Sequence, residues 1–244
     1  MHPMTAKIRL FVDHPLAQAQ SVPLDRDQAN YLFAVMRLSV GDQILVINGV
    51  DGEWLASVTA GSKRGGELTC LEQTRHLQTP PDLWLIFAPI KKARTDFIVE
   101  KATELGAAAI FPVQTDFTNS ERIRQDRLQA HAIEATEQCG GTYVPQVHEL
   151  QSLTKVLDTW PQDRYILFCD ETKVGETPTP FDQLPKGKWA ILIGPEGGFS
   201  DAERARLHAM SHAFPISLGP RILRADTAAV SALSLWQMTL GDWT

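Results

Sequence analysis

The chain has 244 residues, of which 43% are hydrophobic and 21% are charged, and its formal net charge is −6. This composition is typical of a soluble globular protein with one large domain or two smaller ones. No apolar run approaches the roughly 20 residues that are needed to cross a bilayer, which excludes a membrane-spanning protein.

The acidic balance taken alone argues against a nucleic-acid-binding protein, because such proteins usually present a basic face. The basic residues nevertheless gather in three clusters: Lys91, Lys92 and Arg94; Arg122, Arg124 and Arg127; and Arg221 and Arg224. Each cluster on its own is also consistent with an ordinary solvated surface. A shared site would require the clusters to converge, and the sequence alone does not show convergence.

Localisation and metal binding are predicted from absent signals. The first residues, "MHPMTAKIRLFVD", lack the continuous apolar stretch of a signal peptide, so we expect a cytoplasmic protein. Cys70, Cys139 and Cys169 are odd in number and form no CxxC pair. We therefore expect reduced, mostly buried thiols, and neither a disulfide framework nor a metal site.

Residues 1–76 are predicted to form a small, mostly-β domain. Short β-branched or alternating segments at 7–12, 42–48, 53–60 and 66–74 are separated by glycine-containing turns. One helix is expected from Asp27 to Leu38, since its apolar residues recur at helical spacing. Such a domain is expected to be a barrel. Residues 77–82, "LQTPPD", form the predicted linker, because the two prolines disfavour both helix and strand.

From residue 83 onward, strands that are apolar throughout alternate with helices. Strands are predicted at 83–90, 107–113, 164–170, 189–194 and 213–219, and helices at 94–106, 120–141, 200–210 and 225–241. Thr95 or Asp96 is the expected cap of the first of these helices. Ser200 with Glu203 forms a capping box. This alternation predicts an α/β domain, residues 83–244, with a parallel sheet covered on both faces.

The stretch "WAILIGPEGGFSDAE", residues 189–203, places a glycine-rich turn between a buried strand and a capped helix. Ligands of open α/β sheets bind beyond the carboxyl ends of the strands, where this turn lies. It lacks the Gly-Lys-Ser/Thr ending of a phosphate loop and does not match G-x-G-x-x-G. A plain strand-to-helix turn explains the glycines equally well, but Glu196 favours a site for a ligand other than a polyphosphate.

The stretch "SLGPRILRADTAA" repeats this arrangement after the next strand. Arg221 and Arg224 precede an apolar helix whose N-terminus already carries partial positive charge, so they are not placed there for helix stability. Guanidinium groups suit phosphate or carbonyl oxygens. We therefore expect the two strand-end loops to share one pocket, with surface charge as the alternative interpretation of the arginines.

These two motifs resemble the RsmE family, SPOUT-class enzymes that methylate N3 of one uridine in 16S ribosomal RNA with S-adenosylmethionine. Further segments carry the resemblance over nearly the whole chain. They are "FAVMRLSVGDQILVINGVDGEWLASV", "KKARTDFIVEKATELGAAAIFPV" and "RLQAHAIEATEQCGGTYVPQV". The chain departs from the family at Gly141, where an arginine is common, at Asp226, which replaces a glutamate, and in the Thr115–Arg122 segment.

The resemblance implies a SPOUT-type sheet with a C-terminal trefoil knot, preceded by a PUA-like RNA-binding domain. It also implies a homodimer that acts on the small ribosomal subunit. The cofactor-binding residues that it implies are Leu192, Gly194, Pro195, Glu196, Gly197, Gly198, Leu218, Gly219, Ile222, Leu223 and Thr227. The candidate RNA-binding residues are Arg37, Lys63, Arg64, Lys91, Lys92, Arg94 and Arg122.

Uridine N3 carries a proton at neutral pH, so its methylation needs help. Arg221 or Arg224 could stabilise the charge that develops on the neighbouring carbonyl oxygens, which we regard as the main effect. Glu196 or Asp226 could accept the proton as a general base. Asp226 could alternatively orient an arginine. Another SPOUT enzyme that methylates the ribose 2′-oxygen, a non-catalytic RNA-binding protein, and a nucleotide-dependent oxidoreductase are the rival interpretations; the missing glycine fingerprint argues against the last.

Overall fold

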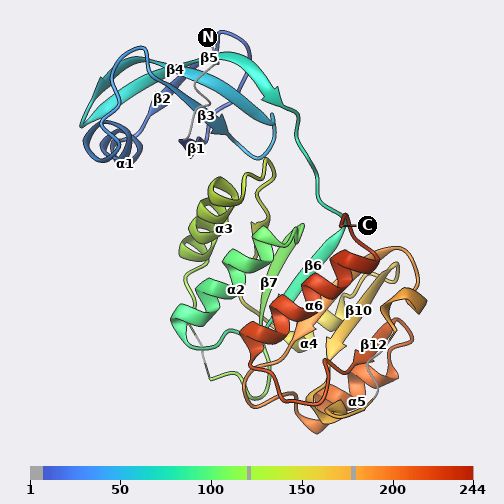
Figure 1. Ribbon diagram of the computed structural model, residues 1–244. Coiled ribbons are helices and arrows are strands. Elements are labelled where there is room, and N and C mark those ends of the chain that lie inside the picture. The colour runs from blue at the N-terminus through green and yellow to red at the C-terminus, as the bar shows by residue number, and fades with distance from the viewer. Residues whose placement is uncertain (1–7, 120–121, 177–179, 244) are drawn as a thin grey trace. The chain divides into compact units, whose positions relative to one another are not determined.

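The computed structural model describes residues 8–119, 122–176 and 180–243. The chain forms two compact units (Figure 1). The first comprises residues 1–79 and 136–144, and the second comprises residues 80–135 and 145–244. The predicted domain of residues 83–244 includes the segment 136–144. In the structure this segment packs within the first unit.

The first unit contains a five-stranded sheet with the order β1-β3-β4-β5-β2. Its strands are β1 (Arg9–Phe11), β2 (Ser21–Leu24), β3 (Gln43–Ile47), β4 (Glu53–Ser62) and β5 (Gly65–Arg75). The four predicted strands correspond to β1, β3, β4 and β5. The sequence analysis missed β2, which is only four residues long and contains a proline. Within the described residues no ladder joins the edge strands β1 and β2, so backbone pairing does not close the expected barrel.

The predicted helix of the first unit is present, but it changes from an α-helix to a π-helical turn along its length. Asp25 caps α1 (Arg26–Asn30) and forms a capping box with Gln28. The backbone then widens into a π-helical turn at Tyr31–Val35. The Phe33 ring lies against Gly61 and Gly66, where any Cβ atom would overlap it. Those two glycines therefore allow the helical turn to sit on the β4–β5 hairpin.

A buried ion-pair group holds the segment 136–144 within the first unit. Glu53 accepts hydrogen bonds from Arg9 Nε at 2.9 Å and from Arg75 Nη2 at 2.9 Å. The Arg9 guanidinium also donates to the carbonyl oxygens of Thr136 and Gly141, at 2.8 Å and 2.7 Å. Gly141 thus supplies a backbone acceptor to this group, at the position where the resembled family commonly has an arginine.

The second unit contains a parallel sheet, as predicted, but the sheet has seven strands rather than the five that were expected, because the two-residue strands β8 and β9 were missed. Its main order is β12-β10-β11-β6-β7-β8, and β9 also pairs with β7. The strands are β6 (Leu83–Phe87), β7 (Ala109–Gln114), β8 (Gln146–Val147), β9 (Gln151–Ser152), β10 (Arg164–Cys169), β11 (Lys188–Ile193) and β12 (Ala213–Ile216). Because these strands are parallel, the loops after β6, β7, β10, β11 and β12 all lie at one edge.

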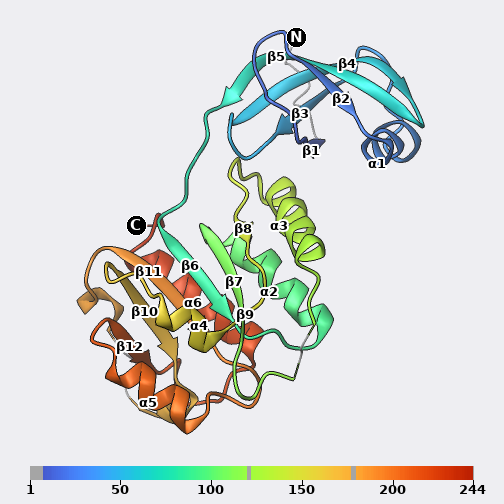
Figure 2. The same cartoon turned by 180° about the vertical axis from the view of Figure 1, so that it is seen from behind.

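Helices cover both faces of this sheet, which explains why its strands are apolar throughout. One face packs against α2 (Lys92–Glu104), α3 (Gln125–Cys139) and α6 (Ala225–Thr239). The other face packs against α4 (Leu153–Asp158) and α5 (Asp201–Ala209), which Figure 2 shows from behind. None of the helices in the described residues is both long and apolar enough to span a membrane.

Two helix starts differ from the sequence prediction. Helix α2 begins at Lys92, and Lys91 is its cap without a side-chain hydrogen bond. Thr95 and Asp96 therefore lie inside the helix, and the Thr95 hydroxyl instead donates to the Ile90 carbonyl oxygen at 3.0 Å. Helix α3 begins at Gln125 rather than at residue 120; residues 120 and 121 lie outside the described residues. The predicted trefoil knot remains a prediction.

Candidate active site

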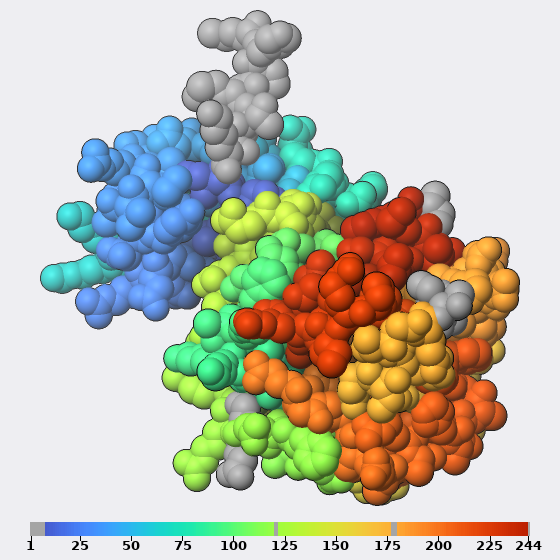
Figure 3. Space-filling model, turned by 60° about the horizontal axis from the view of Figure 1, so that its bottom comes forward, coloured from blue at the N-terminus to red at the C-terminus, as the bar shows by residue number. Residues whose placement is uncertain are grey.

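Three loops meet at the carboxyl edge of the second unit's sheet. They follow the adjacent strands β12, β10 and β11 and comprise residues 217–224, 170–175 and 194–199. Figure 3 turns this edge forward, and shows loop segments from the last quarter of the chain, in orange, on the same face as segments near residue 100, in green. This is the edge at which open α/β sheets bind ligands.

The loop after β11 is the predicted glycine-rich turn. Gly198 has φ +71° and donates its N–H to the Pro195 carbonyl oxygen at 3.0 Å. A Cβ atom at Gly198 would overlap the carboxylate of Glu171, from the neighbouring loop. Ser200 and Glu203 then form the predicted capping box of α5. Glycine is therefore needed at position 198 both for the backbone conformation and for the close approach of Glu171.

Glu171, which the sequence analysis did not select, fastens the loop after β10 to the glycine-rich loop. Its Oε1 atom accepts hydrogen bonds from Phe199 N at 3.3 Å and from Arg204 Nη1 at 2.7 Å. The 170–175 loop also contacts the loop after β12, because Gly175 N donates to the Gly219 carbonyl oxygen at 3.3 Å. The three loops are thus linked by hydrogen bonds into one structure.

Two adjoining cavities lie among these loops, with volumes of about 60 Å³ and 190 Å³. They share Cys169, Glu171, Ile222, Leu223 and Ala228. Of the residues predicted for the site, these cavities are lined by Gly194, Pro195, Glu196, Gly197, Gly198, Leu218, Arg221, Ile222 and Leu223. The structure therefore brings the two predicted motifs together around one compound pocket.

Four predicted residues do not line either cavity. Leu192 is fully buried in β11 and packs in the core. Gly219 contacts the 170–175 loop, Arg224 is the cap of α6, and Thr227 is exposed in the first turn of that helix. Arg221 and Glu196 thus line the pocket, whereas Arg224 lies at its margin.

The sequence analysis also missed the residues that follow β10. Cys169, Asp170, Glu171 and Val174 line the compound pocket, together with Ile216, Ala225 and Ala228. One feature of the sequence could have identified this loop. The buried segment "RYILFCD" is followed by a polar loop, which lies at the same edge of the sheet as the two selected motifs. The strand-end rule, applied to this strand as well, would have found the loop.

The polar side chains of this third loop are themselves held in place. Burial alone would raise the pKa of Asp170, but hydrogen bonds from Thr172 and His208 outweigh it and leave the pKa below its ordinary value. His208 Nε2 lies 3.2 Å from Asp170 Oδ2. Burial raises the pKa of the Cys169 thiol to about 12, so this pocket residue stays protonated at neutral pH. Cys70 is buried, Cys169 is partly exposed and Cys139 is exposed, so the three thiols are less buried than expected.

Asp226 contacts an arginine that the sequence analysis placed in a different group. Its Oδ2 atom lies 3.6 Å from Nη1 of Arg94, which is near the start of α2. The Arg94 Nη1 atom is buried and has no hydrogen-bond partner. Both side chains are largely shielded, with exposed fractions of 29% for Arg94 and 18% for Asp226. This pair links the first turns of α2 and α6.

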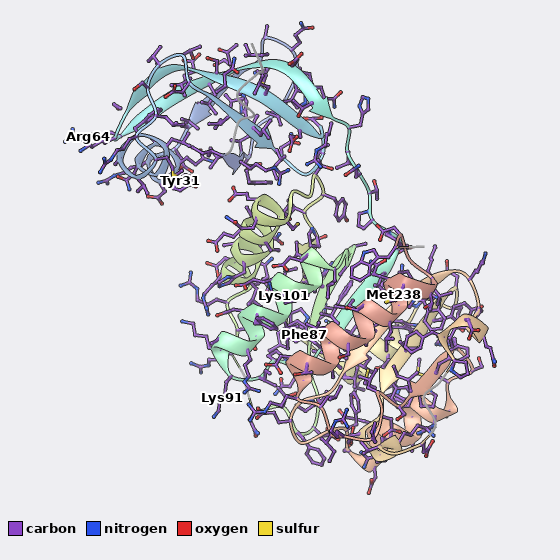
Figure 4. All side chains as sticks on the ribbon, in the orientation of Figure 1. Tyr31, Arg64, Phe87, Lys91, Lys101 and Met238 are labelled. Carbon is purple, nitrogen blue, oxygen red and sulfur yellow. The ribbon has the colours of Figure 1, made fainter. Side chains whose placement is uncertain are left out.

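The remaining predicted RNA-binding residues fall into two groups. Arg37, with φ +59°, follows the π-helical turn of the first unit, and Lys63 and Arg64 lie between β4 and β5. In the second unit, Lys91 lies at the exposed start of α2, where Figure 4 labels it. Lys92 and Arg122 line a further cavity at this end of the helix.

The pocket suits a ligand with apolar and hydrogen-bonding parts. Ile216, Ile222 and Leu223 supply apolar surface, the glycine-rich loop brings backbone close to the cavity, and Glu171 and Glu196 supply carboxylates. Three lining carboxylates, those of Asp170, Glu171 and Glu196, against a single lining arginine disfavour a polyphosphate. In the described residues no group of three acidic, histidine or cysteine side chains could hold a metal ion.

The fold and this pocket are those of an RNA methyltransferase with an additional β domain. A model of the RNA methyltransferase domain matches residues 78–237, and a model of the RNA methyltransferase PUA domain matches residues 24–69. The chain is 30% identical to ribosomal RNA small subunit methyltransferase E of Rickettsia conorii, over 93% of each chain. The chain belongs to this RsmE family of RNA methyltransferases.

Solved structures agree over almost the full length. Ribosomal RNA small subunit methyltransferase E from Neisseria gonorrhoeae, bound to S-adenosylmethionine, is 26% identical with a TM-score of 0.85, covering 97% of this chain and 99% of that one. A putative methyltransferase from Legionella pneumophila, also in complex with this cofactor, is 27% identical with a TM-score of 0.84, covering 96% and 98%. These likenesses extend over both units.

Proposed function

We propose that this protein transfers the methyl group of S-adenosylmethionine to N3 of one uridine in 16S ribosomal RNA, within the small ribosomal subunit. The observation that carries the proposal is the compound pocket between the loops after β10, β11 and β12. Membership of the RsmE family supplies the reaction and the substrate. Because ribosomal RNA is the substrate, we further propose that the protein acts in the cytoplasm.

The pocket residues fit this cofactor, whose sulfonium centre supplies an activated methyl group when it is bound. Ile222 and Leu223 provide apolar contact for an adenine ring, and the backbone of residues 194–198 can approach the ligand closely. Glu171 Oε1 is already engaged by Arg204 and Phe199, which orients the carboxylate for hydroxyl or ammonium donors. The absence of phosphate in the cofactor agrees with the acidic lining.

Arg221 is the proposed catalytic cation, with Arg224 beside it at the margin of the pocket. A guanidinium near the uracil carbonyl oxygens stabilises the negative charge that the base carries once N3 has lost its proton, and this charge disappears when N3 takes the methyl group and the sulfonium becomes a neutral thioether. Glu196 lines the pocket and is exposed, so it remains a candidate base for the N3 proton. Asp226 is instead proposed to position Arg94, with which it forms an ion pair.

The first unit is proposed to hold RNA away from the reacting base, through Arg37, Lys63 and Arg64. Proteins recognise folded RNA largely by shape and phosphate contacts, so cations at the β4–β5 turn and after the π-helical turn suit this role. The target uridine must leave its stack to enter the pocket, at a cost of a few kcal/mol. Phosphate contacts on either side of the base help to offset that cost.

We also propose a homodimer that forms through the exposed sides of α2 and α6. Phe97 of α2 and Leu235 and Met238 of α6 are large apolar residues with exposed fractions of 40%, 41% and 61%. The two helices lie side by side in both ribbon views, and Figure 4 labels Lys101 and Met238 on them. Apolar side chains that are exposed together on adjacent helices are typical of an interface.

The decisive experiment is mass spectrometry of nucleosides from small-subunit RNA of a strain that lacks the gene. We expect the loss of one 3-methyluridine and its return when the gene is restored. The purified protein should form the same nucleoside in isolated subunits when S-adenosylmethionine is added. A 2′-O-methyl nucleoside would identify a ribose methyltransferase, and failure to bind the cofactor in calorimetry would overturn the catalytic assignment.

A further inference from the structure

A further cavity, of about 270 Å³, opens beside the loop that joins β6 to α2, outside the cofactor pocket. It lies between the first turn of α2 and the segment that leads into α3. Four of its lining side chains are cationic, namely Lys92, Arg122, Arg124 and Arg127, and one, Asp96, is anionic. On a chain with a net charge of −6, this is a marked local excess of positive charge.

Two of the four cations already have carboxylate partners. Arg127 donates to Asp96, whose side chain is only 11% exposed. Arg124 pairs with Asp126 at 2.5 Å on the exposed first turn of α3. Among the described residues, neither Lys92 nor Arg122 forms an ion pair. These two cations therefore line the cavity without an ion-pair partner among the described side chains.

The start of α2 adds to this positive field rather than reducing it. The first turn contains no acidic residue, and the cap, Lys91, makes no side-chain hydrogen bond. A helix N-terminus carries about half a positive charge, so acidic side chains are the residues that would stabilise it. The lysines here therefore destabilise the helix slightly, which is understandable if an anion occupies the cavity.

The cavity lies next to the cofactor pocket. Strand β6, which ends at one border of the cavity, pairs with β11, which ends at the glycine-rich loop. The contact of Arg94 with Asp226 bridges α2 and α6 between the two sites. A nucleotide whose base enters the cofactor pocket would thus have its backbone near the basic cavity.

We propose that this cavity binds a phosphodiester group of the substrate RNA beside the target nucleotide. Lys92 and Arg122 contact the phosphate oxygens, and Asp96 positions Arg127 as a third donor. The inference rests on the proposed function for RNA as the substrate, and it adds a defined phosphate site to it.

The test compares a double variant, Lys92→Gln with Arg122→Gln, with a control, Lys188→Gln with Arg206→Gln. The control removes the same charge from the exposed Lys188 and the partly exposed Arg206, which pair with Asp163 and Asp158. Steady-state methylation of small subunits isolated from a strain lacking the gene is measured at several salt concentrations. We expect the double variant to lose at least tenfold in kcat/KM through KM, while calorimetry shows unchanged cofactor affinity.

The salt dependence provides the specific readout. Each lost phosphate contact should reduce the slope of log kcat/KM against log salt concentration by about 1. The charge-conserving variant Lys92→Arg with Arg122→Lys should recover most of that slope, which a merely misfolded protein would not do. A double variant with the control's KM and slope overturns the proposal.

A failure of the proposed function is distinguishable from a failure of the phosphate site. If the unaltered protein does not methylate small subunits, binding of fluorescently labelled 16S RNA is measured instead by anisotropy over the same salt series. A reduced slope for the double variant alone then supports the phosphate site independently of the reaction. Equal slopes for the double variant and the control contradict it in this assay as well.

Discussion

Gly198 and Gly175 both adopt left-handed backbone conformations at the edge of the cofactor pocket, with φ of +71° and +85°. A Cβ atom at Gly198 would overlap Glu171, whereas one at Gly175 meets nothing within 4 Å. Alanine at either position should cost about 1 kcal/mol of stability through backbone strain. Only Gly198→Ala should also displace Glu171 and weaken binding of S-adenosylmethionine, by about tenfold. Calorimetry and thermal unfolding of the two variants check this, and equal affinities would contradict the role given to Glu171.

The 3.6 Å contact between the side chains of Asp226 and Arg94 indicates that Asp226 holds Arg94 in position. The variant Asp226→Asn keeps the shape of the residue but removes its charge, so Arg94 should lose its fixed position. We expect kcat for methylation to fall about tenfold while the dissociation constant of the cofactor stays unchanged, because neither residue lines the cofactor pocket. An exposed acid in the first turn of another helix, Asp27 of α1, provides the control variant Asp27→Asn. A proton-accepting role for Asp226 would instead give a loss of activity that higher pH restores.

At the scale of whole elements, Glu53 of β4 joins two arginines to the carbonyl oxygens at the end of α3. Burial alone would raise the pKa of Glu53, but hydrogen bonds from Arg75, Thr74 and Arg9 outweigh it and leave the pKa below 4.5. The ionised carboxylate therefore stabilises the folded protein above that pH, and the stabilisation is lost as the pH falls through the folded-state pKa.

The variant Glu53→Gln should therefore destabilise the protein by about 3 kcal/mol at pH 7, because it leaves the largely buried Arg9 guanidinium and the partly exposed Arg75 guanidinium without their carboxylate. The difference from the unaltered protein should shrink as the pH falls through the lowered pKa of Glu53. Glu67→Gln on the neighbouring strand is the control, since Glu67 is an exposed acceptor for Ser21 and its loss should cost less than 0.5 kcal/mol. Urea unfolding between pH 3 and pH 8 measures both. A Glu53→Gln penalty that does not depend on pH would contradict this account.

The sequence predicted well those elements whose apolar residues follow the pattern of a buried strand or helix. The apolar strands of the second unit and the capping box at Ser200 follow directly from local patterns. The start of α2 was not predictable in this way, because Thr95 uses its hydroxyl on Ile90 and leaves the cap to Lys91. Glu171 was missed for a related reason. Its importance depends on the approach of Gly198 from a separate loop, which no spacing along the chain encodes.

For the whole molecule, the acidic net charge and the basic cavity have to be considered together. A net charge of −6 repels polyanionic RNA at long range, while the cavity at the start of α2 attracts phosphate at short range. Net charge taken alone therefore argues wrongly against an RNA partner. The distribution of charge over the folded molecule decides binding, and this distribution appears only in the fold. Affinity for RNA should depend strongly on correct docking and little on general attraction.

The proposed dimer gives the last prediction. Leu235→Glu places a charge on the exposed side of α6, where a partner subunit would have to bury it, so the dimer should dissociate. Leu71→Glu is the matched control, because Leu71 is 38% exposed on the first unit and Leu235 is 41% exposed. Sedimentation equilibrium should give a monomer for Leu235→Glu, and a dimer for Leu71→Glu and for the unaltered protein. Leu235 does not line the cofactor pocket, so any loss of methylation in this variant would show that the site depends on the second subunit. A dimer that survives the substitution would exclude this face of α6 as the interface.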